Sequence, residues 1–179
     1  MSAVSLTGAA EGLARIGVKG PQAAGWLAAR GVAVPAAPNR WCALDDGACL
    51  RLGRGEYFVE GGGSVARLAD ELTPGPGVYP VLRQDACVVL AGGDAEAILA
   101  QACAYDFATQ APDMVVLTSM LGVSTQVIWR AADTARAYHL WCDASFGPYF
   151  TATLAGIVRE HGGNVFSLPQ AGRKGSVEP

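Results

Sequence analysis

The glycine-rich turns are the places where this chain could bind a phosphate group. Gly92-Gly93-Asp94 lies between an apolar strand and a helix, and Gly61-Gly62-Gly63-Ser64 has a similar composition. Backbone N–H groups at the start of a helix can hold an anion. Neither turn has the spacing of a nucleotide-binding loop, and the carboxylate of Asp94 would repel a phosphate. We therefore interpret the first turn as structural and the second as a flexible loop.

Residues suited to acid–base or nucleophilic chemistry are scattered along the chain. The two histidines, His139 and His161, stand in no motif, and no G-x-S-x-G elbow presents a serine nucleophile. Asp45-Asp46 precede Gly47, which is the composition of a solvent-exposed turn. Further aspartates stand alone: Asp85, Asp106, Asp113 and Asp143. Because no acid is paired with a base, we expect no catalytic or cofactor-binding residue and interpret the histidines as structural.

The cysteines have neither the number nor the spacing of a metal or disulfide framework. They form an odd set without a C-x-x-C pair: Cys42, Cys49, Cys87, Cys103 and Cys142. Free cysteines of this kind are usually reduced, buried thiols. We expect no metal site and no disulfide.

The four tryptophans are candidates either for a partner interface or for core filling. Tryptophan is enriched among the residues that dominate binding energies at protein interfaces. Trp129 and Trp141 fall on neighbouring strands of an expected hairpin and could share one face. We select Trp41, Trp129 and Trp141 as candidate interface residues.

Composition sets limits on the class of protein. Apolar residues make up 51% and charged residues 16%, against about 45–50% and about 25% in ordinary globular chains. So little charge favours permanent association with another chain. The net charge of −3 excludes the basic field that nonspecific nucleic-acid binding requires. No apolar run reaches the about 18 residues of a membrane span, and the first residues do not resemble a secretory signal, so we expect a cytoplasmic protein.

Glycines and prolines divide the chain into alternating strands and helices. In the first half we expect a helix over 22–30, an extended connection over 32–39, a hairpin of strands 48–52 and 56–60, and a helix over 65–72 capped by Ser64.

The second half follows a similar plan with longer elements. We expect strands over 78–82 and 86–90, a helix from Asp94 to about residue 104, and extended segments over 114–120, 123–130 and 137–142. A helix over 146–161 closes this half, with Asp143 or Ser145 as its cap and an apolar stripe that includes Tyr149 and Phe150 as its core face.

A repeat accounts for this similarity. Segment 16–28 has a counterpart at 88–100, and in both a short strand ends at a glycine, Gly20 or Gly92, before an alanine-rich helix. Two copies are too few for a solenoid. We therefore predict one duplicated α+β domain over 1–168, with halves at about 13–77 and 78–168, followed by a disordered or partner-bound tail over 169–179.

Three stretches together resemble the gamma subunits of heterotetrameric sarcosine oxidases. They are LRLGRGEYF at 50–58, VLAGGDAEAIL at 89–99 and SFGPYF at 145–150, and the similarity runs from about residue 15 to 163. The resemblance implies the folate-binding fold of the glycine cleavage T-protein and YgfZ-like proteins. That fold has two pseudo-repeated β-β-α-β-β-β-α units whose first strands are swapped.

The residues that carry folate chemistry in that fold are absent. T-proteins hold a catalytic aspartate after a glycine-containing turn, but the matching stretch here is GVSTQVI at 122–128, which has no carboxylate and offers Thr125 and Gln126 instead. The KGCYxGQE signature of YgfZ-like proteins is also missing. The resemblance therefore implies an accessory subunit without an active site of its own.

The same resemblance implies which partners carry the chemistry. A beta subunit would hold FAD, an alpha subunit would carry NAD and a tetrahydrofolate-binding domain, FMN would lie between alpha and beta, and a delta subunit would hold zinc. Related chains serve oxidases or dehydrogenases of other N-methyl amino acids, so the substrate does not follow. The alternative hypothesis is a stand-alone folate-binding or aminomethyl-transferring protein.

Overall fold

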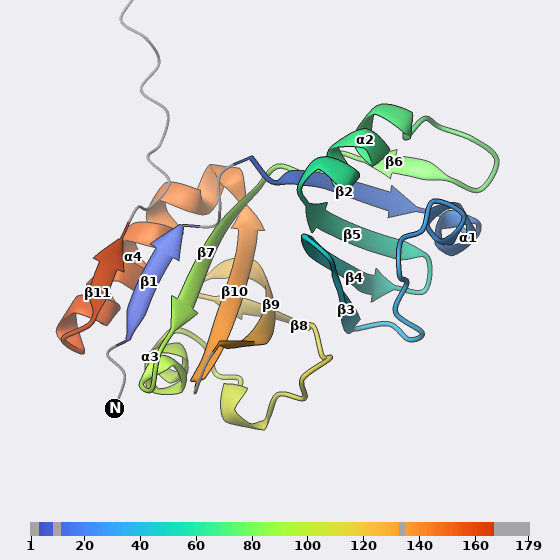
Figure 1. The fold of residues 1–179 in the computed structure, drawn as a ribbon. Helices are drawn as coiled ribbons and strands as arrows, with labels where there is room; N and C mark the ends of the chain where they lie inside the picture. Colours follow the sequence, from blue (N-terminus) through green and yellow to red (C-terminus); the bar gives the residue numbers. More distant parts are fainter. Residues whose placement is uncertain (1–3, 9–11, 133–134, 167–179) are drawn as a thin grey trace, which may run out of the picture. The chain divides into compact units, whose positions relative to one another are not determined.

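The computed structural model describes residues 4–8, 12–132 and 135–166. The chain divides into two compact units. Unit 1 draws on Met1–Ala9, Asp85–Gln110 and Thr118–Pro179, and unit 2 on Ala10–Gln84 and Ala111–Leu117. Each unit has its own sheet (Figure 1). The predicted tail over 169–179 lies outside the described residues.

Unit 2 is an antiparallel sheet of five strands in the order β3-β4-β5-β2-β6 with two helices. The strands are β2 (Ala14–Lys19), β3 (Arg40–Leu44), β4 (Gly47–Gly53), β5 (Glu56–Gly61) and β6 (Tyr79–Val81). The helices are α1 (Ala23–Ala28) and α2 (Gly63–Glu71).

The core of unit 2 follows from the two-residue period of its strands. Ile16 and Val18 on β2 face the same way as Val59 on β5, and all three are buried. Leu27 of α1 and Val65 of α2 belong to the same apolar cluster. Burial of such side chains contributes about 1.5–3 kcal/mol each, which is what holds the helices to the sheet.

Unit 1 is a sheet of six strands in the order β11-β1-β7-β10-β9-β8. The strands are β1 (Ser5–Gly8), β7 (Asp85–Ala91), β8 (Val116–Met120), β9 (Val123–Ala132), β10 (Ala135–Asp143) and β11 (Asn164–Phe166). The helices are α3 (Ala95–Ala102) and α4 (Gly147–Glu160), with short 3₁₀ turns η1 (Phe107–Thr109) and η2 (Ala144–Phe146). α3 contacts α4, and α4 contacts β7, β1 and β11.

Two short strands complete sheets that are otherwise built from distant sequence. β1 lies between β7, to which it is antiparallel, and β11, to which it is parallel. β6 pairs with β2, although it directly precedes β7 in the sequence. Unit 1 therefore needs the first residues of the chain to fill the interior of its sheet.

The turns after β2 and β7 have the same backbone conformation. Gly20 has φ +121° and Gly92 has φ +122°, values that favour glycine because it has no Cβ. The first helical bonds also correspond: Trp26 N–H donates to the Gln22 carbonyl at 2.9 Å, and Ile98 N–H donates to the Asp94 carbonyl at 3.1 Å.

The structure confirms the expected helices and hairpins and corrects several details. Ser64 is not a cap, because it lies inside α2 and its hydroxyl donates to the Asp46 carboxylate. Asp94 occupies the cap position of α3 without a side-chain hydrogen bond. The Asp143 carboxylate accepts a hydrogen bond from Ser145 N–H and therefore caps η2. It does not cap α4. Three strands that the sequence analysis did not predict are β1, β3 and β11.

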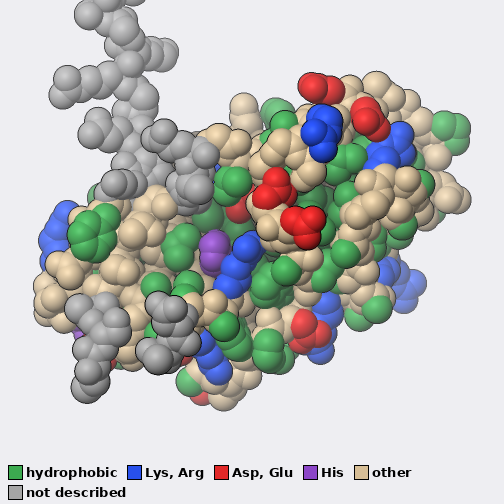
Figure 2. Space-filling view, in the orientation of Figure 1, with side chains coloured by type: hydrophobic (Ala, Val, Ile, Leu, Met, Phe, Trp, Pro, Cys, Tyr) green, Lys and Arg blue, Asp and Glu red, His purple; other side chains and the backbone are tan. Residues whose placement is uncertain are grey.

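Surface charge is sparse on the face shown in Figure 2. Hydrophobic and uncharged atoms cover most of this face, and Lys and Arg side chains lie in separate places on it. Among the described residues, no helix is long and apolar enough to cross a membrane.

We expect Leu6→Ala to destabilise the protein, because Leu6 is fully buried and lies opposite Leu90 in β7. A buried Leu→Ala change costs about 2–5 kcal/mol of unfolding free energy. Urea unfolding followed by circular dichroism measures this change. The control is Ser5→Ala on the same strand, which should cost less than about 1 kcal/mol; equal effects of the two variants would show that β1 does not depend on burial of Leu6.

Candidate functional sites

The glycine turn before α3 borders a pocket of about 560 Å³ in unit 1. Gly92, Glu96, Trp129 and Arg136 are among the residues that line it. Arg136 is the basic group that a bound anion would need. Its availability therefore decides whether this pocket is a phosphate site.

Arg136 is engaged by its own unit. Its guanidinium donates to the backbone carbonyls of Phe107 and Ala108 at 3.1 and 3.2 Å, and it lies 4.5 Å from the centre of the Trp129 ring. Glu96 lies 3.8 Å away and accepts a 2.7 Å hydrogen bond from the Tyr138 hydroxyl. A phosphate would have to compete with these partners and approach Glu96. The arrangement supports the interpretation of this turn as structural.

Tyr138 is the fully buried member of this hydrogen-bond network. Burial is the main reason that the pKa of Tyr138 is raised to about 12, although its hydrogen bond with Arg136 acts in the opposite direction. The phenol therefore remains protonated at neutral pH and acts as a donor to Glu96. It joins β10 to α3.

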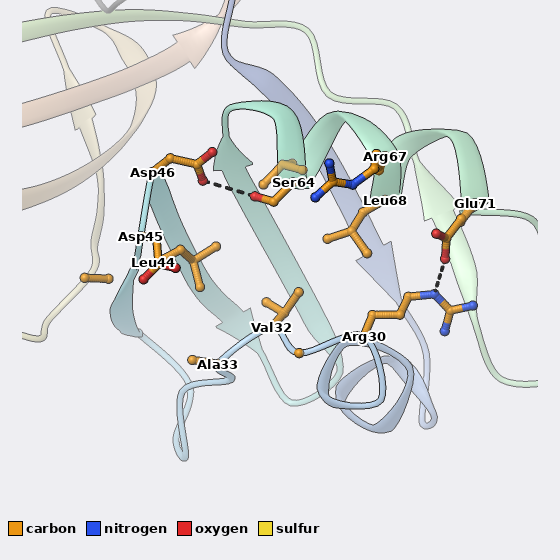
Figure 3. Close-up of a pocket in the computed structure, with 13 residues that line it drawn as sticks. Arg30, Val32, Ala33, Leu44, Asp45, Asp46, Ser64, Arg67, Leu68 and Glu71 are labelled. Carbon is orange, nitrogen blue, oxygen red and sulfur yellow. Dashed lines mark hydrogen bonds and ion pairs between the residues drawn. The ribbon is translucent and has the colours of Figure 1, made fainter.

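A second pocket, of about 430 Å³, lies in unit 2 between the β3–β4 hairpin, α2 and residues 31–33. Its apolar lining includes Val32, Leu44 and Leu68. Figure 3 shows charged side chains around it, with Asp45 and Asp46 on the hairpin and Arg67 on the helix. The sequence analysis did not bring these residues together, because they come from three separate segments.

The groups around the second pocket are suited to binding and not to covalent catalysis. Arg30 pairs with Glu71 at 2.9 Å, and the Ser64 hydroxyl donates to Asp46 at 3.1 Å. No histidine lines the pocket to activate the Ser64 hydroxyl. Within the described residues, no three metal-ligating side chains are grouped either.

The two histidines do not form part of an acid–base couple. His139 stacks on Trp141 with ring centres 5.7 Å apart. Its pKa is lowered to about 4, first because burial disfavours the charged ring and second because Arg130 repels it. His161 lies at the end of α4 and contacts the side chain of Gln101. Each histidine is accounted for by its local structure.

The stretch that matches the T-protein aspartate lies on β9. Thr125 is buried, and its hydroxyl donates to the Val123 carbonyl at 3.0 Å. Gln126 follows on the opposite face of the sheet. β9 contains no aspartate or glutamate, so it supplies no carboxylate for proton transfer or for orienting an amine.

The candidate interface tryptophans have different environments. Trp41 and Trp129 are half-buried, and their indole N–H groups donate to the carbonyls of Pro112 and Gln110. Trp141 has no exposed surface, so it is not available to a partner. The expectation that Trp129 and Trp141 share a face is wrong, because Trp129 lies opposite Tyr138, three residues before Trp141 on β10.

Two exposed aromatic side chains at the start of α4 were missed. Phe146 and Tyr149 are 51% and 55% exposed. The sequence analysis placed Tyr149 on the core face of its helix, but the buried stripe consists of Phe150, Leu154 and Val158. The motif SFGPYF could have indicated these residues, since Pro favours the first turn of a helix and the aromatics beside it therefore lie at the helix start.

Several solved structures resemble this chain, whereas no family model and no curated protein matches it. One of these structures is a chain of heterotetrameric sarcosine oxidase from Corynebacterium sp. U-96 in complex with pyrrole 2-carboxylate, with 23% identity and a TM-score of 0.71 over 88% of this chain and 84% of that one. Another is glycine cleavage system aminomethyltransferase T from Bartonella henselae, with 14% identity and a TM-score of 0.67. Here the match covers 93% of this chain and 48% of that one. These matches establish a T-protein-like α+β fold.

His139 provides a test of the burial described above. Since its folded-state pKa is about 4 and its ordinary value is 6.5, its contribution to stability is present above pH 6.5 and is lost as the pH falls toward 4. Between pH 7 and pH 5 this contribution should fall by about 1–2 kcal/mol. Urea unfolding of His139→Gln should show a shallower loss of stability with falling pH than the wild type. The same slope in both proteins would contradict burial of His139.

Proposed function

We propose that this chain is an accessory, non-catalytic gamma-type subunit of a heterotetrameric, flavin-dependent oxidase or dehydrogenase of sarcosine or a related N-methyl amino acid. The main support for this proposal is the structural match to the sarcosine oxidase chain. Most of both chains is covered, so the two are similar in length as well as in fold. By contrast, this chain spans about half of the aminomethyltransferase.

The absence of a carboxylate on β9 also favours an accessory role. An aminomethyl-transferring protein needs an acidic group near the folate amines, and the two pockets supply no acid–base pair that could replace it. In the proposed assembly, FAD, FMN, NAD, tetrahydrofolate and zinc belong to alpha, beta and delta partners. We place this assembly in the cytoplasm.

We infer further that the two units derive from one duplicated β-β-α-β-β-β-α unit with exchanged first strands. The order β2-α1-β3-β4-β5-α2 has the same sequence of element types as β7-α3-β8-β9-β10-α4. β1 pairs with β7 and β6 pairs with β2, which is the pairing expected after an exchange. The matching φ values of Gly20 and Gly92 support the same inference.

The proposed contacts with partners use aromatic side chains that their own unit leaves partly uncovered. They are Trp41 in unit 2, and Trp129, Phe146 and Tyr149 in unit 1. Trp41, Trp129 and Tyr149 are held by hydrogen bonds to backbone carbonyls. Aromatic side chains bury a large area on association and lose little side-chain entropy. These groups are suited to a permanent interface with the alpha partner.

Co-expression with flavoprotein and folate-domain chains of the proposed assembly should yield one complex containing this chain. Size-exclusion chromatography with flavin absorbance measures assembly, and sarcosine-dependent dye reduction measures activity. We expect Trp129→Ala to weaken partner binding at least about fivefold, as truncation of an interface hot spot does. A chain that elutes as a monomer in the presence of these partners would contradict the proposal.

Trp26→Ala is a matched control for Trp129→Ala. Both rings are half-buried and both are covered by an arginine, with Arg30 at 4.0 Å from Trp26 and Arg136 at 4.5 Å from Trp129. The loss of a cation–π contact is therefore common to both variants. Equal weakening by the two variants would assign the effect to stability and not to an interface at Trp129.

The chain alone should not bind folate, because the carboxylate expected on β9 is missing. Titration of the isolated chain with tetrahydrofolate, followed by tryptophan fluorescence, tests the alternative function. We expect no saturable quenching after correction for absorption by the ligand. Saturable quenching would instead favour a stand-alone folate-binding or aminomethyl-transferring protein.

A further inference from the structure

Two cysteines lie directly opposite each other on the β3–β4 hairpin. Cys42 and Cys49 are Cα partners in the antiparallel register, and both side chains lie on the apolar core of unit 2. Opposed residues in such a pair have Cα atoms about 4.5–5.5 Å apart, and a disulfide spans about 4.4–6.8 Å. The backbone of this hairpin is therefore already in position for a bond between the two sulfur atoms.

The two thiols differ in their access to water. Cys49 has no exposed surface and belongs to the apolar core of unit 2, whereas Cys42 is only partly buried at the edge of that core. The remaining cysteines, Cys87, Cys103 and Cys142, are buried. Cys42 is therefore the cysteine of this chain that a small reagent in solution meets first.

The neighbouring Cys49 thiol favours ionisation of Cys42. It lowers the pKa of Cys42 to about 7, against a smaller opposing effect of burial, whereas Cys42 and burial raise the pKa of Cys49. Thiolate is the nucleophilic form of cysteine, so Cys42 is the more reactive of the two. In the structure the Cys42 S–H donates to the Ala33 carbonyl at 3.2 Å, so Cys42 becomes nucleophilic when it loses this proton.

We propose that Cys42 and Cys49 form a reversible, peroxide-oxidised thiol pair, in which Cys42 reacts with a hydroperoxide and Cys49 converts the product into a disulfide across the hairpin. In the first step the Cys42 sulfur attacks hydrogen peroxide. An S–O bond forms, the O–O bond breaks, and hydroxide leaves. Cys42 is oxidised to a sulfenic acid while the peroxide is reduced.

In the second step the Cys49 sulfur attacks the Cys42 sulfur. An S–S bond forms, the S–O bond breaks, and the Cys49 proton leaves with the hydroxide as water. A dithiol reductant reverses the reaction by exchange. The disulfide closes the hairpin whose Asp45-Asp46 turn borders the pocket of unit 2, so oxidation fixes one wall of that pocket.

Peptide mass spectrometry of the full-length protein tests the pair directly. Trypsin cleaves after Arg40 and Arg51, so both cysteines fall in one peptide, residues 41–51. After treatment with hydrogen peroxide at neutral pH and alkylation of the remaining thiols, this peptide should lose two hydrogen atoms and escape alkylation. Treatment with dithiothreitol should restore both thiols. A peptide that remains fully alkylated after peroxide would overturn the proposal.

Variants separate the roles of the two cysteines. In Cys49→Ser, which keeps a hydroxyl group beside Cys42, Cys42 should accumulate as a sulfenic acid that dimedone traps, with no disulfide. Cys103→Ala is the control and should form the 41–51 disulfide at the wild-type rate. In the unmodified protein, iodoacetamide at pH 7 should label Cys42 at least about tenfold faster than Cys103. Faster labelling of Cys103, or no trapped sulfenic acid in Cys49→Ser, would also overturn the proposal.

Discussion

The pairing of β1 inside the sheet of unit 1 is the constraint on which the rest of that unit depends. Leu6 is opposite Leu90 on one side and Val165 on the other, so three segments from the beginning, middle and end of the described chain must meet. Closing such long loops costs entropy before any apolar contact compensates for it. The sheet is therefore complete only when nearly the whole chain has been made, and unit 1 is not a continuous stretch of sequence that can be separated from unit 2.

Charged groups in both units are used to hold loops and strands together. Arg51 donates to several backbone carbonyls of neighbouring loops, and Arg15 forms a 2.6 Å ion pair with Glu60, which is 3% exposed. Arg136 is occupied in the same way by η1. A buried charge is tolerated only when its partners are fixed. These charged groups therefore hold loops and strands together in both units.

Periodicity and turn residues were enough to predict the long elements, and they failed where tertiary contacts decide the structure. β9 and β10 are long and β-branched or aromatic, and they lie close to their expected positions. β1 and β11 contain four and three residues, too few for any period to be visible. β3 pairs with β4 along one edge. Along its other edge, Trp41 N–H donates to the carbonyl of Asp113, which is distant in sequence. The pockets were missed for the same reason, since their side chains converge from segments that share no local pattern.

The start of α4 shows how local packing holds exposed aromatic side chains in place. A Cβ at Gly147 would lie 2.8 Å from the Cβ of Ala86, so glycine lets the helix begin directly against β7. The Tyr149 hydroxyl donates to the Leu121 carbonyl at 3.2 Å, which fixes the exposed ring from its polar end. Phe146 and Tyr149 are therefore presented on a rigid element while about half of each side chain remains uncovered. Because a rigid aromatic surface loses little entropy on association, this local packing favours a stable interface more than a larger but mobile apolar patch would.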